Sequence, residues 1–327
     1  MIEPRAIAII ASREDVATLK NCIDAVIRAC QGTPAVIDVL VNGNPLLADM
    51  VAKTDIDCYQ GCKVRVWSIT QGDKAHAWNE YVHRIWPRHG NAVFIDGYVE
   101  VSENALNALE NALAASTQAW AATGVPTSGR SAARARAQML REGGFQGNLH
   151  TLRTHAMHAL RAKGIRLPLG LYRTDSLIGA LLILGLEPAV NRWDRERIAV
   201  EPDAVWKVRE LGRITWRSLV SQWKRMLRQA QGDLENRAAR EHLSIKRLGP
   251  ELMPATAREL VNTWIAEQGT QARRLFFRRP LCAYAAWQLR PARDWSLAAI
   301  APVLVADVGN VGNRQESDHR GAESIGA

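Results

Sequence analysis

The chain has 327 residues, of which 47% are hydrophobic and 23% charged, and a formal net charge of +9. This is the composition of a globular protein with a sizeable core, and no apolar run approaches the roughly 20 residues that a membrane-spanning helix needs. The start, MIEPRAIAIIAS, lacks the basic and apolar regions of a signal peptide, so we expect a cytoplasmic protein.

Four short β-rich runs open the chain, separated by helical or loop-like stretches. Near-continuous apolar strands that alternate with helices predict an α/β fold with a mostly parallel sheet covered on both faces. Ligands bind at the carboxyl ends of such strands, and the polar or glycine-bearing segments found there predict a ligand crevice. The runs are AIAIIAS (6–12), AVIDVLVNG (35–43), CKVRVWSI (62–69) and NAVFIDG (91–97).

Helical signals dominate the rest of the chain. Ser12, with Asp15 at the third position of a capping box, is expected to begin the first helix, and Ser102 the helix 102–116. The tail 309–327 is polar and glycine-rich, which predicts disorder. Between them we expect strands at 120–126 and 197–208, a strand turning into a helix at 147–164, an apolar helix within 172–188 and a basic helix at 215–236.

Charge is unevenly distributed along the chain. Residues 1–127 hold 10 Lys and Arg against 14 Asp and Glu, whereas the remaining residues hold 32 against 19. A basic half suits nucleic acid, anionic lipid or phosphorylated ligands, but no zinc module, RNA-binding signature or helix-turn-helix pattern favours a nucleic-acid partner. Four arginines are expected on a solvated or phosphate-facing side of one helix: Arg130, Arg134, Arg136 and Arg141.

Metal-ligand patterns built on cysteine or histidine are weak. Cys58-x-x-x-Cys62 is the only close cysteine pair, and without a second pair at ligand spacing the five cysteines are interpreted as reduced thiols. His150, His155 and His158 flank the predicted strand-to-helix turn, where a structural role is favoured over metal binding.

The order of motifs between residues 5 and 236 resembles that of the family-2 glycosyltransferases, GT-A-fold enzymes that transfer a sugar from a nucleotide diphosphate. AIIASREDVATL is similar to the family's first strand and acidic loop, VLVNGNPLLAD to a strand ending in a glycine turn, and GDKAHAWN to its glycine-lysine segment. VFIDGYVEVSENALNAL aligns with the strand that carries the Asp-x-Asp motif. YRTDSLIGALLILG resembles the acidic pair before an apolar helix, and QWKRM the Gln-x-x-Arg-Trp motif.

The resemblance implies a GT-A-type, Rossmann-like mixed sheet flanked by helices, followed by a helical C-terminal extension. The transferase domain would span 1–236, divided into a nucleotide-binding half at 1–127 and an acceptor half at 128–236. A helical basic extension at 237–308 and the disordered tail would follow.

The resemblance also implies roles for individual residues. Asp175 would be the general base of an inverting transfer from a nucleotide-sugar donor to an acceptor hydroxyl, although an aspartate at a helix start is also a common cap. Gln222 and Arg225, three residues apart on one helix face, would contact the acceptor or the diphosphate, or form a solvated basic face. The residues expected to bind the nucleotide sugar are Ser12, Glu14, Asn42, Lys74, Asn79 and Asp96.

Asp96 has three interpretations. It could bind Mn²⁺ or Mg²⁺ together with the phosphates and water, as in Asp-x-Asp enzymes. It could instead hold sugar or ribose hydroxyls while Lys74 and arginines of the second half meet the diphosphate charge, or simply cap the following turn.

Several positions depart from the family pattern. Tyr98 replaces the second aspartate, Thr174 the first acid of the pair, and Met226 the tryptophan, while Asn42 stands where a carboxylate is usual. These changes leave open an active enzyme or a catalytically silent protein that binds nucleotides or sugars. A nucleotidyltransferase and a dinucleotide dehydrogenase are disfavoured, because the loop after the first strand has neither the basic glycine-rich stretch nor the G-x-G-x-x-G they require.

Aromatic residues outside these motifs suggest two further contacts. Trp216 and Trp223 lie seven residues apart on one helix and are expected in the core rather than against a sugar. Segment 272–305 combines arginine clusters with Phe276, Phe277, Trp287 and Trp295. It could lie in the interface at the inner face of a membrane, cover the core or form a homodimer contact.

Overall fold

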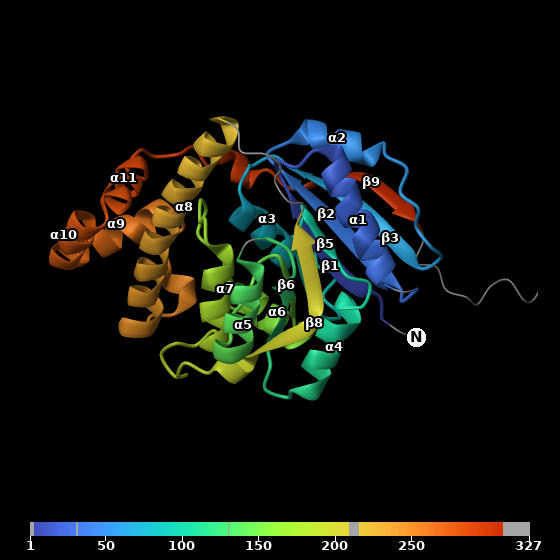
Figure 1. Cartoon of the computed structure of the whole chain (residues 1–327), viewed down its shortest axis with the longest axis horizontal. Coiled ribbons are helices and arrows are strands. Elements are labelled where there is room, and N and C mark those ends of the chain that lie inside the picture. Colours follow the sequence, from blue (N-terminus) through green and yellow to red (C-terminus); the bar gives the residue numbers. More distant parts are fainter. Residues whose placement is uncertain (1–2, 31, 130, 209–215, 310–327) are drawn as a thin grey trace, which may run out of the picture.

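The computed structural model describes residues 3–30, 32–129, 131–208 and 216–309, with backbone only at 216–222. Of the tail predicted at 309–327, Gly309 is described, as the last residue of a strand, whereas residues 310–327 lie outside the described residues. Arg130 and the side chains of Trp216 and Gln222 also lie outside them. The described residues form an α/β fold built on one nine-stranded mixed sheet, with a helical unit on one side (Figure 1).

The four predicted N-terminal strands are confirmed and form the parallel part of the sheet. They are β1 (Arg5–Ala11), β2 (Ala35–Asn42), β3 (Cys62–Ile69) and β4 (Ala92–Asp96), adjacent in the order β4-β1-β2-β3. Ile9 of β1 pairs with Val39 of β2 on one side and with Ile95 of β4 on the other. The carboxyl ends of these strands therefore share one edge.

The second half of the sheet is mixed. The predicted strands β6 (Ala121–Pro126), β7 (Leu149–Leu152) and β8 (Ile198–Val208) are confirmed, and a short strand β5 (Val99–Val101) joins them. β7 lies antiparallel between β4 and β6, β8 is parallel to β6, and β5 is antiparallel to β8. Strand β4 is thus the point where the parallel half meets the mixed half.

Helices cover both faces of the sheet, as the apolar strands predicted. Along β1, Ile7 and Ile9 face one core layer, while Ala8 and Ile10 face the other. The first layer contains α1 (Val16–Cys30), α2 (Pro45–Ala52) and α4 (Ala105–Ala115), and the second contains α3 (Lys74–Glu80), α6 (Thr154–Ala162) and α7 (Thr174–Ile183). Helix α5 (Ala132–Glu142) contacts β6 and β8.

The expected starts of two helices were misplaced. The carboxylate of Asp15, not Ser12, caps α1 by accepting a hydrogen bond from the backbone N–H of Thr18 at 2.7 Å. Ser12 has a different role, because its own N–H donates to Glu14. Helix α4 begins at Ala105, one turn beyond Ser102.

A cluster of helices forms a separate small core at one side of the molecule (Figure 1). It consists of α8 (Trp216–Arg240), α9 (Ala257–Glu267), α10 (Gly269–Arg278) and α11 (Pro280–Gln288). Helix α8 crosses the expected domain boundary at residue 236. Short π or 3-10 turns occur at Tyr81–Ile85, Arg195–Arg197, Glu241–Ile245, Pro250–Leu252 and Ser296–Ala299.

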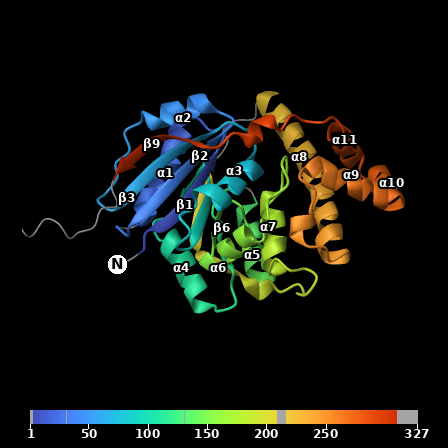
Figure 2. The same ribbon diagram turned by 180° about the vertical axis from the view of Figure 1, so that it is seen from behind.

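The extension is not helical throughout, which corrects the prediction for residues 237–308. After α11 the chain runs back to the sheet, where β9 (Val303–Gly309) pairs antiparallel with β3, as seen from behind in Figure 2. Segment 272–305 is not one continuous helix, because Pro280 begins a new helix after α10 and a short turn follows Trp295.

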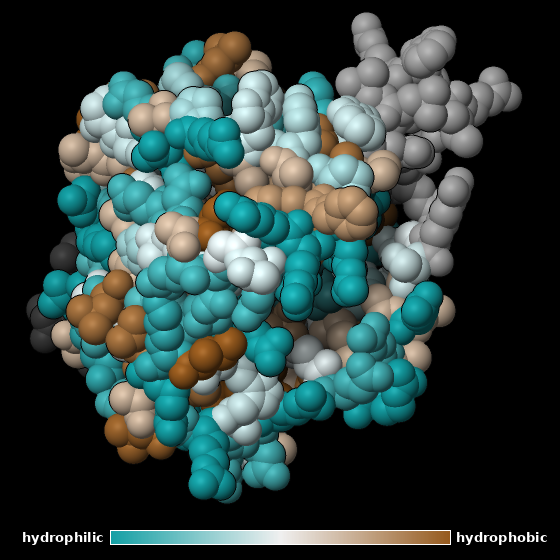
Figure 3. Space-filling view, turned by 90° about the vertical axis from the view of Figure 1, so that its left-hand side faces the viewer, coloured by the Kyte–Doolittle hydropathy of each residue, from teal (hydrophilic) through white to brown (hydrophobic). Residues whose placement is uncertain are grey.

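The outer face of the helical cluster carries separate hydrophobic side chains among hydrophilic ones (Figure 3). Phe277 is 91% exposed, and the stacked pair Tyr284 and Trp287 is also exposed. Trp223 is 51% exposed, so its expected place in the core was wrong. Among the described helices none is both long and apolar enough to cross a membrane.

Candidate functional site

A small pocket lies at the carboxyl edge of the sheet, where β1 and β4 meet α3 and α7. Charged groups from three separate segments line it: Lys74 from the start of α3, Asp96 from the end of β4, and Asp175 from the first turn of α7. His150 of β7 and Gly147 complete its polar part. The predicted crevice is thus present, and it brings together three of the residues expected to act on a ligand.

Asp96 is held by two side chains. The residue is 6% exposed; Oδ1 of its carboxylate lies 2.5 Å from Nζ of Lys74, and Oδ2 accepts a hydrogen bond from the Tyr98 hydroxyl at 3.0 Å. Gly97 allows this turn to press against β1, because a Cβ there would lie 2.8 Å from Cβ of Ala11. The carboxylate therefore has a fixed position and a partner on each oxygen.

Lys74 is placed by the cap of its own helix. Asp73 accepts hydrogen bonds from the N–H of His76 at 2.8 Å and of Gly170 at 2.9 Å, which ties the start of α3 to the loop before α7. Partial burial acts to lower the pKa of Lys74, but the Asp96 carboxylate outweighs it and holds that pKa above its usual value. The ammonium is therefore charged at neutral pH.

Asp175 lines the same pocket as Lys74 and Asp96, and its charge helps to raise the pKa of Lys74. Gly147 packs against both Asp175 and Lys74, since a Cβ at that position would lie 3.1 Å from Cβ of Asp175 and 3.6 Å from Nζ of Lys74. Among the described residues no hydrogen bond or ion pair within 4.0 Å engages the Asp175 carboxylate. A carboxylate that is near a cation yet unpaired can accept a proton.

The start of α7 is fixed by a residue that the sequence did not indicate. Glu235 of α8, 1% exposed, accepts hydrogen bonds at 3.0 Å from the N–H groups of Tyr172 and Arg173. Burial raises the pKa of Glu235, while these donors act in the opposite direction. Glu235 therefore positions the turn that carries Asp175, and the helical cluster is joined to the site.

His150 forms the floor of the pocket rather than a metal ligand. Its ring stacks on Phe94 with centroids 5.1 Å apart, and Nδ1 lies 3.1 Å from the carbonyl oxygen of Gln146, which assigns the proton to Nδ1. Burial, and next the charge of Lys74, lower the pKa of His150 to about 3, so the ring is neutral.

The other histidines and the cysteines do not converge on a metal site among the described residues. The ring of His155 packs against Trp120 and that of His158 against Trp86, so the three histidines have different surroundings. All five cysteines are free thiols. Within the described ranges no three His, Cys, Asp or Glu side chains are grouped so as to hold a metal ion.

The first loop borders the site but is largely bonded to itself. Oε2 of Glu14 accepts the backbone N–H groups of Ser12 at 2.6 Å and Arg13 at 2.8 Å. The carbonyl of Ser12 accepts a hydrogen bond from Asn44. Glu14 still contributes to raising the pKa of Lys74 and so lies within electrostatic range of the ligand edge.

The structure gives two expected sugar-binding asparagines a structural role instead. Asn42 is 2% exposed and donates to the carbonyl of Ala11 at 2.7 Å, fastening the end of β2 to that of β1. Asn79, also 2% exposed, bonds through both ends of its amide to the backbone of Leu167, at 2.9 and 2.8 Å. Neither asparagine is among the residues that line the pocket, and both side-chain amides are already hydrogen-bonded to backbone groups.

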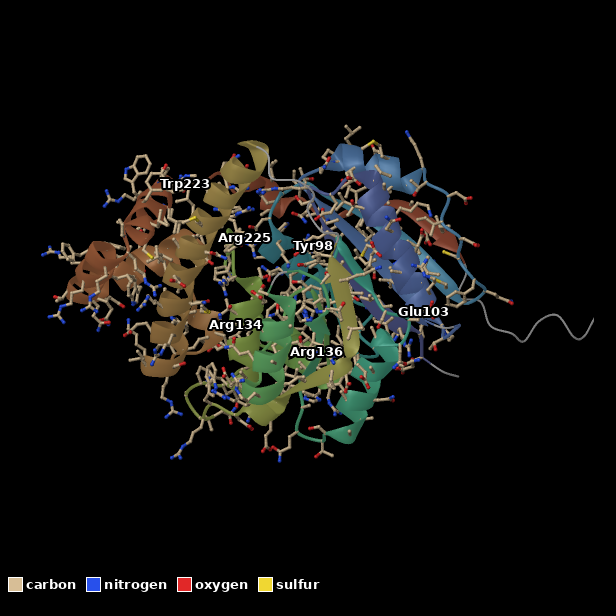
Figure 4. The ribbon with its side chains drawn as sticks, viewed as in Figure 1. Tyr98, Glu103, Arg134, Arg136, Trp223 and Arg225 are labelled. Carbon is tan, nitrogen blue, oxygen red and sulfur yellow. The ribbon has the colours of Figure 1, made fainter. Side chains whose placement is uncertain are left out.

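Helix α8 presents a basic stripe toward the start of α7. Residues seven apart lie on one helix face, so Arg225 shares a face with Gly232, which packs against Arg173. On the same side, the Arg228 guanidinium lies 6.0 Å from the ring centre of Tyr172. Figure 4 shows Arg225 on the side of α8 toward Tyr98, and Trp223 on the opposite side.

The α5 arginines are less closely connected to the pocket. Arg134 is exposed and Arg136 half-buried on that helix (Figure 4), and Arg141 pairs with Glu142 at 2.6 Å. The arginine-rich pattern therefore forms a largely solvated helix side, as one of its two interpretations predicted.

Comparison with known proteins gives a fold likeness only. No family model matches the sequence, and no curated protein does. Among solved structures, a mycobacterial protein is 13% identical, with 72% of this chain and 74% of that chain covered and a TM-score of 0.45. A 4-diphosphocytidyl-2C-methyl-D-erythritol synthase from Anaerococcus prevotii is 12% identical, with 68% and 99% covered and a TM-score of 0.38. Likeness at this level does not indicate an activity.

Proposed function

We propose that the protein is an inverting glycosyltransferase that binds a nucleoside-diphosphate sugar at the carboxyl edge of its sheet. The observation that carries the proposal is the grouping of Asp96, Lys74 and Asp175 at that edge. A buried carboxylate holds an ammonium, and a second carboxylate, which no hydrogen bond or ion pair engages among the described residues, lines the same pocket. The group supplies a cation for a leaving diphosphate and a base for an attacking hydroxyl.

In the proposed reaction, Asp175 accepts the proton of an acceptor hydroxyl as its oxygen attacks the anomeric carbon of the sugar. The new oxygen–carbon bond forms as the bond from that carbon to the diphosphate oxygen breaks. The diphosphate leaves with the electron pair of the broken bond, and attack from the opposite face inverts the anomeric configuration. The ammonium of Lys74 stabilises the charge that develops on the leaving oxygen.

The surrounding elements support these roles. Glu235 fixes the first turn of α7, so the Asp175 carboxylate starts from a defined position. Arg225 and Arg228 lie on the α8 stripe that faces the same turn, where they can meet phosphate oxygens. Such a base positioned within hydrogen-bond reach of its proton contributes about 10²- to 10⁴-fold to rate.

The test is turnover of a panel of nucleotide sugars by the purified full chain, measured as release of nucleoside diphosphate. Asp175→Asn is expected to lower kcat by about 10²- to 10⁴-fold while leaving donor affinity within a few-fold. Asp49→Asn, at an exposed aspartate on α2, is the matched control and should retain full turnover. Turnover that survives Asp175→Asn would refute the assignment.

A second candidate function is a silent binding protein. The observation that favours it is Tyr98, which stands where the family that the sequence resembles has a second aspartate. Its hydroxyl donates a hydrogen bond to one Asp96 oxygen. It predicts nucleotide or sugar binding, seen as thermal stabilisation, without release of diphosphate from any donor. The same panel separates the two, because only the transferase releases diphosphate.

A further inference from the structure

The Asp96 carboxylate already has a cation. The ammonium of Lys74 lies 2.5 Å from one oxygen, and the Tyr98 hydroxyl donates to the other at 3.0 Å. With a side chain 8% exposed, Asp96 has little free surface for another ligand. The position that a divalent ion would take beside this carboxylate is therefore filled by protein groups.

The remaining oxygen ligands do not fit a divalent ion either. Mg²⁺, Mn²⁺ and Ca²⁺ need several oxygen ligands at about 2.0–2.6 Å, usually including more than one carboxylate. Glu100, the next acid along the chain, pairs with Lys207 at 3.1 Å on the neighbouring strand. Asp175 lines the same pocket, but among the described residues no group of three His, Cys, Asp or Glu side chains that could hold a metal ion includes it or Asp96.

We propose that Lys74 takes the place of a divalent metal, so that the protein binds the diphosphate of its donor without one. The inference rests on the proposed function, because it concerns the same ligand at the same edge. An ammonium has three donors, and the hydrogen bond to Asp96 uses one. The Lys74 side chain is 37% exposed, which leaves its remaining donors free to reach phosphate oxygens.

The charge balance shows why one lysine is not sufficient. The charges of Asp96, Asp175 and Glu14 all act on Lys74, so the edge alone carries an excess of negative charge. A diphosphate adds about two to three more negative charges. The α8 stripe supplies the balance, because Arg228 lies over the ring of Tyr172 just before α7, and Arg225 shares its helix face.

The experiment measures binding of inorganic pyrophosphate and of a panel of nucleoside diphosphates to the full chain by titration calorimetry. Each titration is run once in EDTA and once in Mn²⁺. Wild-type affinity for the best diphosphate is expected to agree within about twofold in the two buffers. Lys74→Met is expected to weaken it by about 10- to 100-fold in both, as for a lost charge-assisted hydrogen bond.

Lys20→Met is the matched control, because Lys20 is also 37% exposed and pairs with a carboxylate, Asp24 at 2.8 Å, on α1 outside the pocket. It should bind as the wild type does. Should Lys74→Met not fold, the comparison of EDTA with Mn²⁺ on the wild type still decides the question.

The outcomes separate the two proposals. Wild-type binding that requires Mn²⁺ overturns this inference and leaves the proposed function standing. Diphosphate binding in neither buffer overturns both. Equal binding in the two buffers, weakened by Lys74→Met alone, is the result expected if Lys74 is the cation of the site.

Discussion

His150 makes the stability of the fold depend on pH. The folded-state pKa of this histidine is lowered to about 3 from its usual 6.5, first by burial and then by Lys74. Between those two values the unfolded chain binds a proton that the folded chain does not, so stability is lost as the pH falls through this window. At pH 5 this one group lowers the unfolding free energy by about 2 kcal/mol, whereas at pH 7.5 it lowers the unfolding free energy by almost nothing.

The assay is urea denaturation of the wild type and of His150→Phe at pH 7.5 and pH 5. Phenylalanine keeps a ring against Phe94 but removes the titrating group. The loss of unfolding free energy between the two pH values should be about 2 kcal/mol larger in the wild type than in the variant. Other histidines contribute equally to both proteins. Equal losses would refute the reasoning, whatever the variant's stability at pH 7.5.

Two further predictions concern the helical cluster. Glu235→Ala should lower the unfolding free energy by about 2–4 kcal/mol, since the N–H groups of Tyr172 and Arg173 lose the buried carboxylate that accepts from them, and should lower kcat as Asp175 moves. Glu235→Gln, which keeps one acceptor, should cost less than half as much in denaturation; an equal cost would exclude the capping role. Phe277 and Trp287 are exposed, and arginines lie on α10, so we expect the protein to co-sediment with anionic vesicles. It should not co-sediment with neutral vesicles, and the double variant Phe277→Ser/Trp287→Ser should not co-sediment with anionic ones.

The sheet and the location of its ligand edge were predictable because they depend on local signals. A continuous apolar run such as AVFI, before Asp96, is typical of a strand covered on both faces, and each N-terminal strand matched its run. Asp96 at the end of such a run must lie at the carboxyl edge. Lys74 reaches it because α3 packs against β1, the strand next to β4.

Other parts of the site depend on contacts that no local pattern records. An asparagine looks the same in sequence whether it faces a ligand or bonds to a distant backbone, as Asn42 does at the end of β2 and Asn79 does within α3. In the sequence Glu235 is one acidic residue within a basic helix. Its role as an acceptor for the start of α7 depends on the packing of α8 against α7. The strand β9 was missed for the same reason, because its partner β3 lies some 240 residues away.

The return of β9 to the sheet makes the ligand edge a late product of folding. On the way, Arg293 donates to the carbonyl of Gly72 at 3.0 Å, and the Trp295 ring packs over Gly170, so this stretch clasps the loops before α3 and α7. Contacts so distant in sequence form slowly, and an uncovered β3 edge is a site for aberrant pairing. Until residues 303–309 have been synthesised, the nascent protein has an open sheet edge and an unclasped pocket.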